Sequence, residues 1–281
     1  MSITSDFLKR VDEAPPAWSD NIIAERNINK YQKYSQFVRR AYWTDSGSIN
    51  VFCIRGTDHT DYQGLTWREF LHRGRRMDIN IRLLETNPSY YLGTEVKKTA
   101  MHYVSYNGLD WYVGSDGNHR SCLARFLFYG LDWYVGSDGN HRSCLARFLF
   151  YEKGLTYLHG VSLRHYEFDD ALLSVYEELQ AERLCQQQAG LYWEIDLHSE
   201  TLGREDTPGW KIDHFSPGFT LRLVGGLQGG DQVPESLRRV TVRQADEGRV
   251  LFQQIQSLRQ MQIKPVTGAR WLNRWFRMGA K

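Results

Sequence analysis

Residues 108–129 read GLDWYVGSDGNHRSCLARFLFY, and the same string recurs without a change at 130–151. The string opens with apolar residues at every second position, Leu109, Trp111 and Val113 in the first copy, which is the period of a half-buried strand. A Gly-Ser-Asp-Gly turn follows, and apolar residues then recur at helical spacing. Each copy therefore predicts a strand, a turn and a helix.

The repeat is perfect and occurs twice. Ordinary repeat proteins drift between units and need about three of them for a stable core, so we do not expect a solenoid. Perfect identity instead indicates a recent duplication or an engineered insertion. The parent fold had room for one unit, so either copy could fill that place, and the sequence leaves open which one does. The other copy would expose tryptophan, phenylalanine and leucine, which favours oligomers formed through the duplicated segment.

The turn of each copy has the features of an anion site. In the first copy Asn118 is the expected helix N-cap, so His119 and Arg120 fall in the first helical turn. Cations are disfavoured at that end of a helix unless an anion is bound there. Gly117 would let a phosphate approach the backbone, and Asp116 could hold a metal ion or orient a water. An ordinary turn followed by a His-Arg pair on the surface would give the same sequence, so the sequence favours the anion site and this interpretation equally.

The Gly-Asn-His-Arg segments at 117–120 and 139–142 resemble the Gly-x-His-Arg signature of the ParB/sulfiredoxin-like superfamily. The resemblance covers roughly residues 60–170 and implies a small α/β fold that binds nucleotide phosphates at this loop. It places strands at Ile79–Leu84 and Val161–Phe168. The catalytic cysteine of sulfiredoxin is replaced here by asparagine, and neither a ParB-type arginine-rich motif nor a helix-turn-helix is evident, features that would suit the plasmid fertility-inhibition branch of the superfamily.

The resemblance implies a nucleotide-phosphate-binding protein, a Mg²⁺-dependent nucleotidase or nuclease that takes ATP or CTP and acts on or near plasmid DNA transfer or partition. The expected site residues are the same in both copies. The expected catalytic residues are Asp116, His119, Arg120, Asp138, His141 and Arg142, and the two aspartates are also the expected metal ligands. The expected nucleotide-binding residues are Gly117, Asn118, Ser121, Gly139, Asn140 and Ser143.

Two other functions stay open. A non-catalytic protein could inhibit a DNA-transfer machine through its surface, and a small-molecule kinase could use the same loop. The basic aromatic tail at 270–281 could meet a protein partner or an anionic membrane surface, although its tryptophans could equally cover the protein's own core. Glu194, Asp196 and His198 alternate along an expected strand, which fits either a metal site or polar residues facing solvent.

The whole chain is expected to be α/β (α+β), with a ParB/sulfiredoxin-like domain at 1–172 and a mixed α/β accessory region at 173–281. The expected helices are Asn27–Tyr42, Thr66–Arg73 with a Thr66/Glu69 capping box, the first part of Gly93–Tyr106, Asp170–Gln188 and Glu247–Met261. Outside the repeats, the expected strands are Ile49–Ile54, Asp78–Leu84, Leu158–Phe168, Leu191–Leu197, Phe219–Val224 and Arg239–Arg243.

The composition of the chain limits which partners and which cellular compartment we expect for the protein. The net charge of +2 is too small for DNA binding through bulk electrostatics, so a nucleic-acid surface would have to be a local patch. Cys144 duplicates Cys122, which leaves an odd parent count of cysteines and favours a reducing compartment. The first twenty residues lack the apolar segment of a signal peptide, and no apolar run is long enough for a membrane span. We therefore expect a soluble, cytoplasmic protein.

Overall fold

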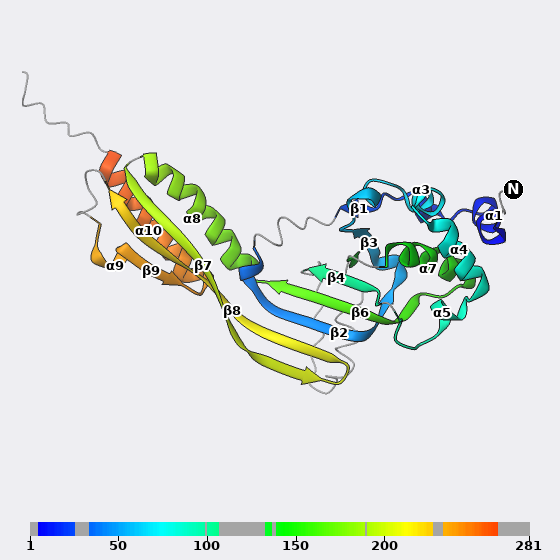
Figure 1. Cartoon of the computed structure of the whole chain (residues 1–281). Coiled ribbons are helices and arrows are strands. Elements are labelled where there is room, and N and C mark those ends of the chain that lie inside the picture. Colours follow the sequence, from blue (N-terminus) through cyan, green and yellow to red (C-terminus); the bar gives the residue numbers. More distant parts are fainter. Residues whose placement is uncertain are drawn as a thin grey trace, which may run out of the picture. The chain divides into compact units, whose positions relative to one another are not determined.

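Figure 1 shows the chain as a computed structural model, in which the described residues are 5–25, 34–98, 100–106, 133–136, 139–188, 190–226 and 233–263. The first copy of the repeat lies outside them. The chain divides into two compact units. Unit 1 comprises Met1–Phe168 and Thr201–Phe215, and unit 2 comprises Asp169–Glu200 and Ser216–Lys281.

Both helices and strands occur throughout the described residues. They form eight α-helices and nine strands with both parallel and antiparallel pairing, which confirms the predicted α/β class. No helix among them is both long enough and apolar enough to cross a membrane.

Unit 1 is built on a mixed sheet. Its strands are β1 (Ala24–Glu25), β2 (Val38–Asn50), β3 (Ile54–Thr57), β4 (His102–Tyr106), β5 (Trp133–Val135) and β6 (Tyr157–Phe168), in the spatial order β1-β3-β5-β4-β6-β2. The pairs β1–β3, β3–β5 and β4–β6 are parallel, whereas β4–β5 and β2–β6 are antiparallel. Residues 211–214 of β8 (Trp210–Gly226) add an antiparallel neighbour to β2.

The helices of unit 1 surround one that is buried. They are α1 (Asp6–Glu13), α3 (Trp67–Arg73), α4 (Met77–Thr86), α5 (Ser89–Leu92) and α7 (Asn140–Lys153), with 3₁₀ turns η1 (Ala17–Asp20), η2 (Ser35–Phe37), η3 (Val51–Cys53) and η4 (Thr60–Tyr62). Every residue of α7 from Ser143 to Phe150 is buried. A helix that is buried on all sides belongs at the centre of its core, and Figure 1 shows α7 among α3, α4 and the sheet.

Unit 2 packs two long helices with a small antiparallel sheet. Helix α8 (Asp170–Gln188) contacts α10 (Ala245–Ile263), and β9 (Arg239–Val242) pairs with the Phe219–Arg222 part of β8. The unit also holds α9 (Glu235–Arg238) and the first part of β7 (Leu191–Thr207). The predicted helices Asp170–Gln188 and Glu247–Met261 and the three predicted strands are confirmed, although β7 and β8 run much further than expected.

Three predictions in unit 1 are correct. Helix α3 begins at a Thr66/Glu69 capping box, in which the Thr66 side chain accepts from the Glu69 N–H and the Glu69 carboxylate accepts from the Thr66 N–H. Strand β6 covers the predicted Leu158–Phe168. The predicted strand and helix of the second copy of the repeat are present, as β5 and α7.

The predicted strand Asp78–Leu84 is wrong, because this segment forms α4. Ile79, Ile81 and Leu83 do alternate, but the buried residues are Met77, Ile81 and Leu84, whose spacings of four and three are helical. Ile79 and Leu83 are exposed. The strand that the superfamily resemblance implied upstream of the loop is therefore a helix.

The predicted helix Asn27–Tyr42 is also wrong in its described part, where Val38–Tyr42 begins β2. The β2–β6 register shifts between Val38 and Arg40, as a β-bulge does. Because the bulge adds one residue, Val38 and Ala41 are both buried although they stand three apart, a spacing that imitates a helix. The predicted strand Ile49–Ile54 is interrupted by η3, and the expected helical start of Gly93–Tyr106 is not found among its described residues.

Candidate functional site

The second copy of the repeat occupies the central place in unit 1. Strand β5 pairs with β3 on one side and β4 on the other, and the Gly136 N–H donates to the His102 carbonyl at 2.9 Å. The expected site residues that lie outside the described residues are Asp116, Gly117, Asn118, His119, Arg120 and Ser121 of the first copy and Asp138 of the second. The candidate site is therefore built here from Gly139, Asn140, His141, Arg142 and Ser143.

Helix α7 begins one residue earlier than predicted. Its N-cap is Gly139, with φ +105°, and Asn140 is the first helical residue. A Cβ at position 139 would lie 3.3 Å from Met101 Cβ at an unfavourable φ, so glycine fits this position best. The Asn140 side chain does not cap its own helix, because its Oδ1 accepts a 2.6 Å hydrogen bond from the Thr57 hydroxyl, in the core.

Ser143 belongs to the interior. It is fully buried, its hydroxyl donates to the Gly139 carbonyl at 2.7 Å, and its oxygen lies 2.9 Å from the Tyr103 hydroxyl. Burial raises the pKa of Tyr103. These bonds fasten the start of α7 to β4, which is a structural role and not a place for a nucleotide.

His141 packs against aromatic rings. Its ring centroid lies 5.5 Å from that of Tyr62 in an edge-on contact and 5.3 Å from that of Phe70. Burial lowers the pKa of His141, against a smaller raising effect of the hydrogen bond to the Arg75 backbone; the charge of His59 lowers it further. A histidine whose pKa falls below its usual 6.5 is mainly neutral at pH 7. His141 therefore contributes little positive charge to this end of the helix.

Arg142, the next residue, has a different environment. Its Nη1 donates to the Tyr90 hydroxyl at 2.6 Å, and its Nη2 donates to the Ala100 carbonyl at 3.4 Å. These two bonds orient the guanidinium at the wall of a cavity of about 340 Å³. The cavity is lined by Asn80, Leu83, Asn87, Tyr90, Tyr91, Lys98 and Arg142. The structure thus brings Arg142, but not His141, to this cavity.

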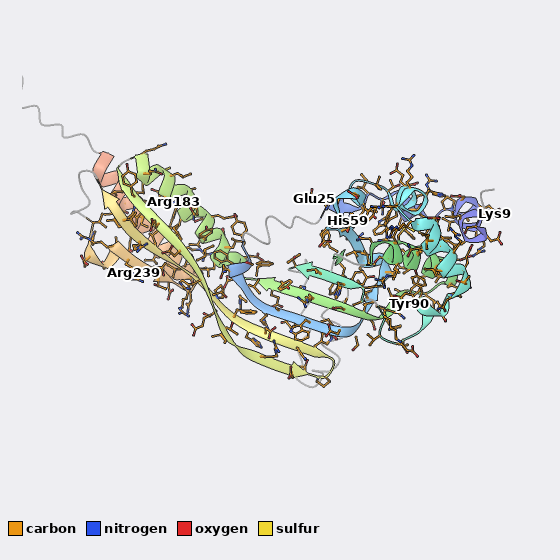
Figure 2. The ribbon with its side chains drawn as sticks, in the orientation of Figure 1. Lys9, Glu25, His59, Tyr90, Arg183 and Arg239 are labelled. Atoms are coloured by element: carbon orange, nitrogen blue, oxygen red, sulfur yellow. The ribbon has the colours of Figure 1, made fainter. Side chains whose placement is uncertain are left out.

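Sequence reasoning missed the rest of this cavity. Its wall comes from α4, α5 and the segment that follows α5, and Figure 2 labels Tyr90 there. Asn80, Leu83 and Asn87 stand three and four residues apart, which is the spacing of one helical face. This helical spacing is present in the sequence, but it conflicts with the strand that was expected at 78–84, so the helical face was not predicted.

The described residues hold no group of three or more histidine, cysteine, aspartate or glutamate side chains that could bind a metal ion. The alternating set in β7 is engaged differently. Arg222 Nη2 lies 2.7 Å from a carboxylate oxygen of Glu194 and 4.0 Å from one of Asp196. His198 Nε2 lies 3.4 Å from the Thr220 hydroxyl. These contacts fit a solvent-facing polar strand.

Comparisons of this chain with models of protein families, with curated proteins and with solved structures find no match.

Proposed function

We propose that unit 1 binds the phosphate of a nucleotide at the cavity beside the start of α7. The observation that supports the proposal is that two cationic side chains, Arg142 and Lys98, line this one cavity. Arg142 also stands in the first turn of a 14-residue helix, where backbone N–H groups point outward and the helix dipole favours an anion.

The remaining wall suits the rest of a nucleotide. Tyr90 and Tyr91 offer aromatic surface, and burial raises the pKa of Tyr91, which keeps its hydroxyl neutral. Asn80 and Asn87 supply amide groups that can donate and accept hydrogen bonds. A mostly apolar hollow with a few polar groups is the usual form of a small-molecule site, and guanidinium groups bind phosphate with charge-assisted bonds.

The proposal extends to Mg²⁺-assisted hydrolysis of the bound phosphoester. Its expected metal ligands, Asp116 and Asp138, lie outside the described residues. The contribution of the described residues is to bind and orient the phosphate through Arg142. A cytoplasmic location, based on the odd parent count of cysteines, is part of the same proposal.

Calorimetric titration with ATP and CTP, with and without Mg²⁺, tests the proposal. Because Arg120 repeats Arg142 in the first copy, the informative variant is Arg120→Ala/Arg142→Ala. Loss of a charge-assisted bond should weaken nucleotide binding roughly tenfold to a hundredfold. Arg249→Ala, an exposed arginine in unit 2, is the matched control and should bind like the parent protein.

Unchanged nucleotide affinity in the double variant, with the fold intact by circular dichroism, would contradict this site. Binding that is retained without any phosphate release in the presence of Mg²⁺ would restrict the proposal to binding. Measurement of phosphate release in the presence of a small-molecule acceptor distinguishes hydrolysis, which releases phosphate, from transfer of the phosphate to the acceptor.

A further inference from the structure

A second cavity adjoins the first. It has a volume of about 560 Å³ and is lined by Asn87, Ser89, Tyr90, Gly93, Thr94, Glu95, Val96, Lys97 and Lys98. Asn87, Tyr90 and Lys98 line both cavities. Each cavity alone is within the usual size range of a small-molecule site, so a single mononucleotide would leave much of the pair unfilled.

Lys97 is the unusual residue of the second cavity. The residue as a whole is only 5% exposed, and its ammonium donates to the Gly93 carbonyl at 2.8 Å. The same ammonium lies 5.6 Å from the centroid of the Tyr90 ring. Burial lowers the pKa of Lys97, with Glu95 partly opposing that effect. The Gly93 carbonyl and the Tyr90 ring hold the ammonium at the wall of the cavity, where it can meet an anionic group of a ligand.

The backbone around Lys97 is held firmly. The Lys97 N–H donates to the Gly160 carbonyl at 2.8 Å. Gly160 has φ +69°, and a Cβ there would lie 1.9 Å from the Glu95 carbonyl oxygen, so only glycine allows this approach. The backbone of Glu95–Lys97 is therefore fixed against β6, and the Lys97 ammonium is held separately by its hydrogen bond to the Gly93 carbonyl.

Tyr90 contacts one cationic side chain from each of the two cavities. Its hydroxyl accepts a hydrogen bond from Arg142, and its ring makes a cation–π contact with the Lys97 ammonium. Lys98 is exposed and lines both sides. Glu95 is the carboxylate on the wall of the second cavity and is also exposed, so two lysines outweigh one acid there.

We infer that the ligand carries two separated phosphate groups, one at Arg142 and one at Lys97, on either side of Tyr90. The chemical class is a dinucleotide or a longer single strand, in which successive phosphates are joined through a sugar. The inference rests on the proposed function, because it adds a second phosphate subsite to the one at Arg142.

The test compares 5′-AMP with the 5′-phosphorylated dinucleotide pApA by calorimetry on the full chain. We expect pApA to bind at least tenfold more tightly than AMP. Lys97→Met should remove most of that advantage and leave AMP affinity within about twofold. Lys97→Arg, which keeps the charge, should retain a preference for pApA. The Arg120→Ala/Arg142→Ala variant should weaken both ligands.

The outcomes separate the two proposals. If neither AMP nor pApA binds, the proposed function fails. If AMP binds and pApA binds no more tightly, or if Lys97→Met weakens both ligands equally, the second subsite is wrong while the first stands. Should Lys97→Met not fold, the affinity ratio in the unaltered protein decides, and Glu95→Gln, at an exposed residue that lines the second cavity and not the first, checks it by strengthening pApA more than AMP.

Discussion

The two units differ in how deeply their positively charged side chains are buried. Among the described residues, the buried cations are Arg147 and Lys97, and both belong to unit 1. The arginines of unit 2 that form ion pairs, such as Arg222 and Arg249, are half exposed. Charge that stays in water costs little and adds little, whereas a buried cation must be held by specific neighbours. In the part of the chain that the structure describes, the difference therefore singles out unit 1 as the place where positive charge is buried.

The largest effect is expected at Arg147. Its guanidinium lies between two tryptophans, 4.5 Å from the ring centroid of Trp18 and 4.2 Å from that of Trp67, and its Nη1 donates to the Ile54 carbonyl. Burial lowers its pKa to about 10, so it remains charged at pH 7. Arg147→Ala, made together with Arg125→Ala in the first copy, should reduce the free energy of unfolding by about 3–4 kcal/mol.

Urea unfolding measures this loss. Arg249→Ala in unit 2 is the control and should change the free energy of unfolding by less than about 0.5 kcal/mol. Arg147→Met keeps the volume without the charge and should recover much of the stability, because a packed apolar side chain can replace a buried ion. Equal losses for Arg147→Ala and Arg249→Ala would remove the contrast between the units.

A second prediction concerns the stability of the folded protein at acidic pH. His165 on β6 is 1% exposed, its ring centroid lies 5.8 Å from that of Tyr42, and burial lowers its pKa to about 4. The unfolded chain binds a proton near pH 6.5 and the folded protein does not, so stability is complete above that pH and is lost as pH falls toward 4. The loss should be on the order of 3 kcal/mol.

Thermal or urea unfolding at several pH values between 7 and 4 follows this loss. His165→Gln removes the titrating group, so its stability should change much less over the same window, whatever its value at pH 7. If the parent protein and His165→Gln lose stability in parallel, other groups cause the acid sensitivity.

The third prediction concerns the repeat itself. Strands β4 and β5 pair in antiparallel register, with Tyr103 opposite Val135 and Val104 opposite Tyr134. Deletion of 108–129 would join Asn107 to Gly130 and reduce the connection between Tyr106 and Asp132 from about 25 residues to three. Asn-Gly is a favoured hairpin turn, and the shorter loop alone should stabilise unit 1 by about 2 kcal/mol.

Unfolding of the deletion variant, compared with the full chain, measures this gain. Deletion of either copy leaves the same sequence, so a variant that fails to fold would mean that one copy is not sufficient to complete unit 1. An unchanged nucleotide affinity in the variant would add that one copy of the loop is sufficient for the site.

The sequence predicts elements well where local signals agree with packing. Helix α8 begins where Asp169 Oδ1 accepts from the Leu172 N–H, and its buried residues Leu172, Val175 and Leu179 keep a helical period. Capping chemistry and periodicity there point to the same structure. In α4 and at the start of β2 they do not, because a short helix and a bulged strand each imitate the other's spacing.

The candidate site could be predicted only in part. The strand, the turn and Arg142 in the first helical turn follow from the repeat alone. The environments of His141 and Arg142 do not, because adjacent helical residues point about 100° apart and α3, α4 and α5 decide what each one meets. Lys97 could not be anticipated, since its burial depends on the long-range contact with Gly160.

The smallest effect is expected in unit 2. Arg222 and Glu194 are each about half exposed, with side-chain exposures of 49% and 51%, so Arg222→Ala should cost less than about 0.5 kcal/mol in urea unfolding. The matched pair in unit 1 is Arg40–Glu167, also 2.7 Å apart, whose carboxylate is only 14% exposed and also accepts from the Tyr42 hydroxyl at 3.2 Å. Arg40→Ala should therefore cost more, about 1 kcal/mol, and should be less sensitive to added salt. If Arg222→Ala proves the more damaging of the two, the charges of unit 2 are not merely solvated, and the polar face of β7 would have to be reconsidered as a binding surface.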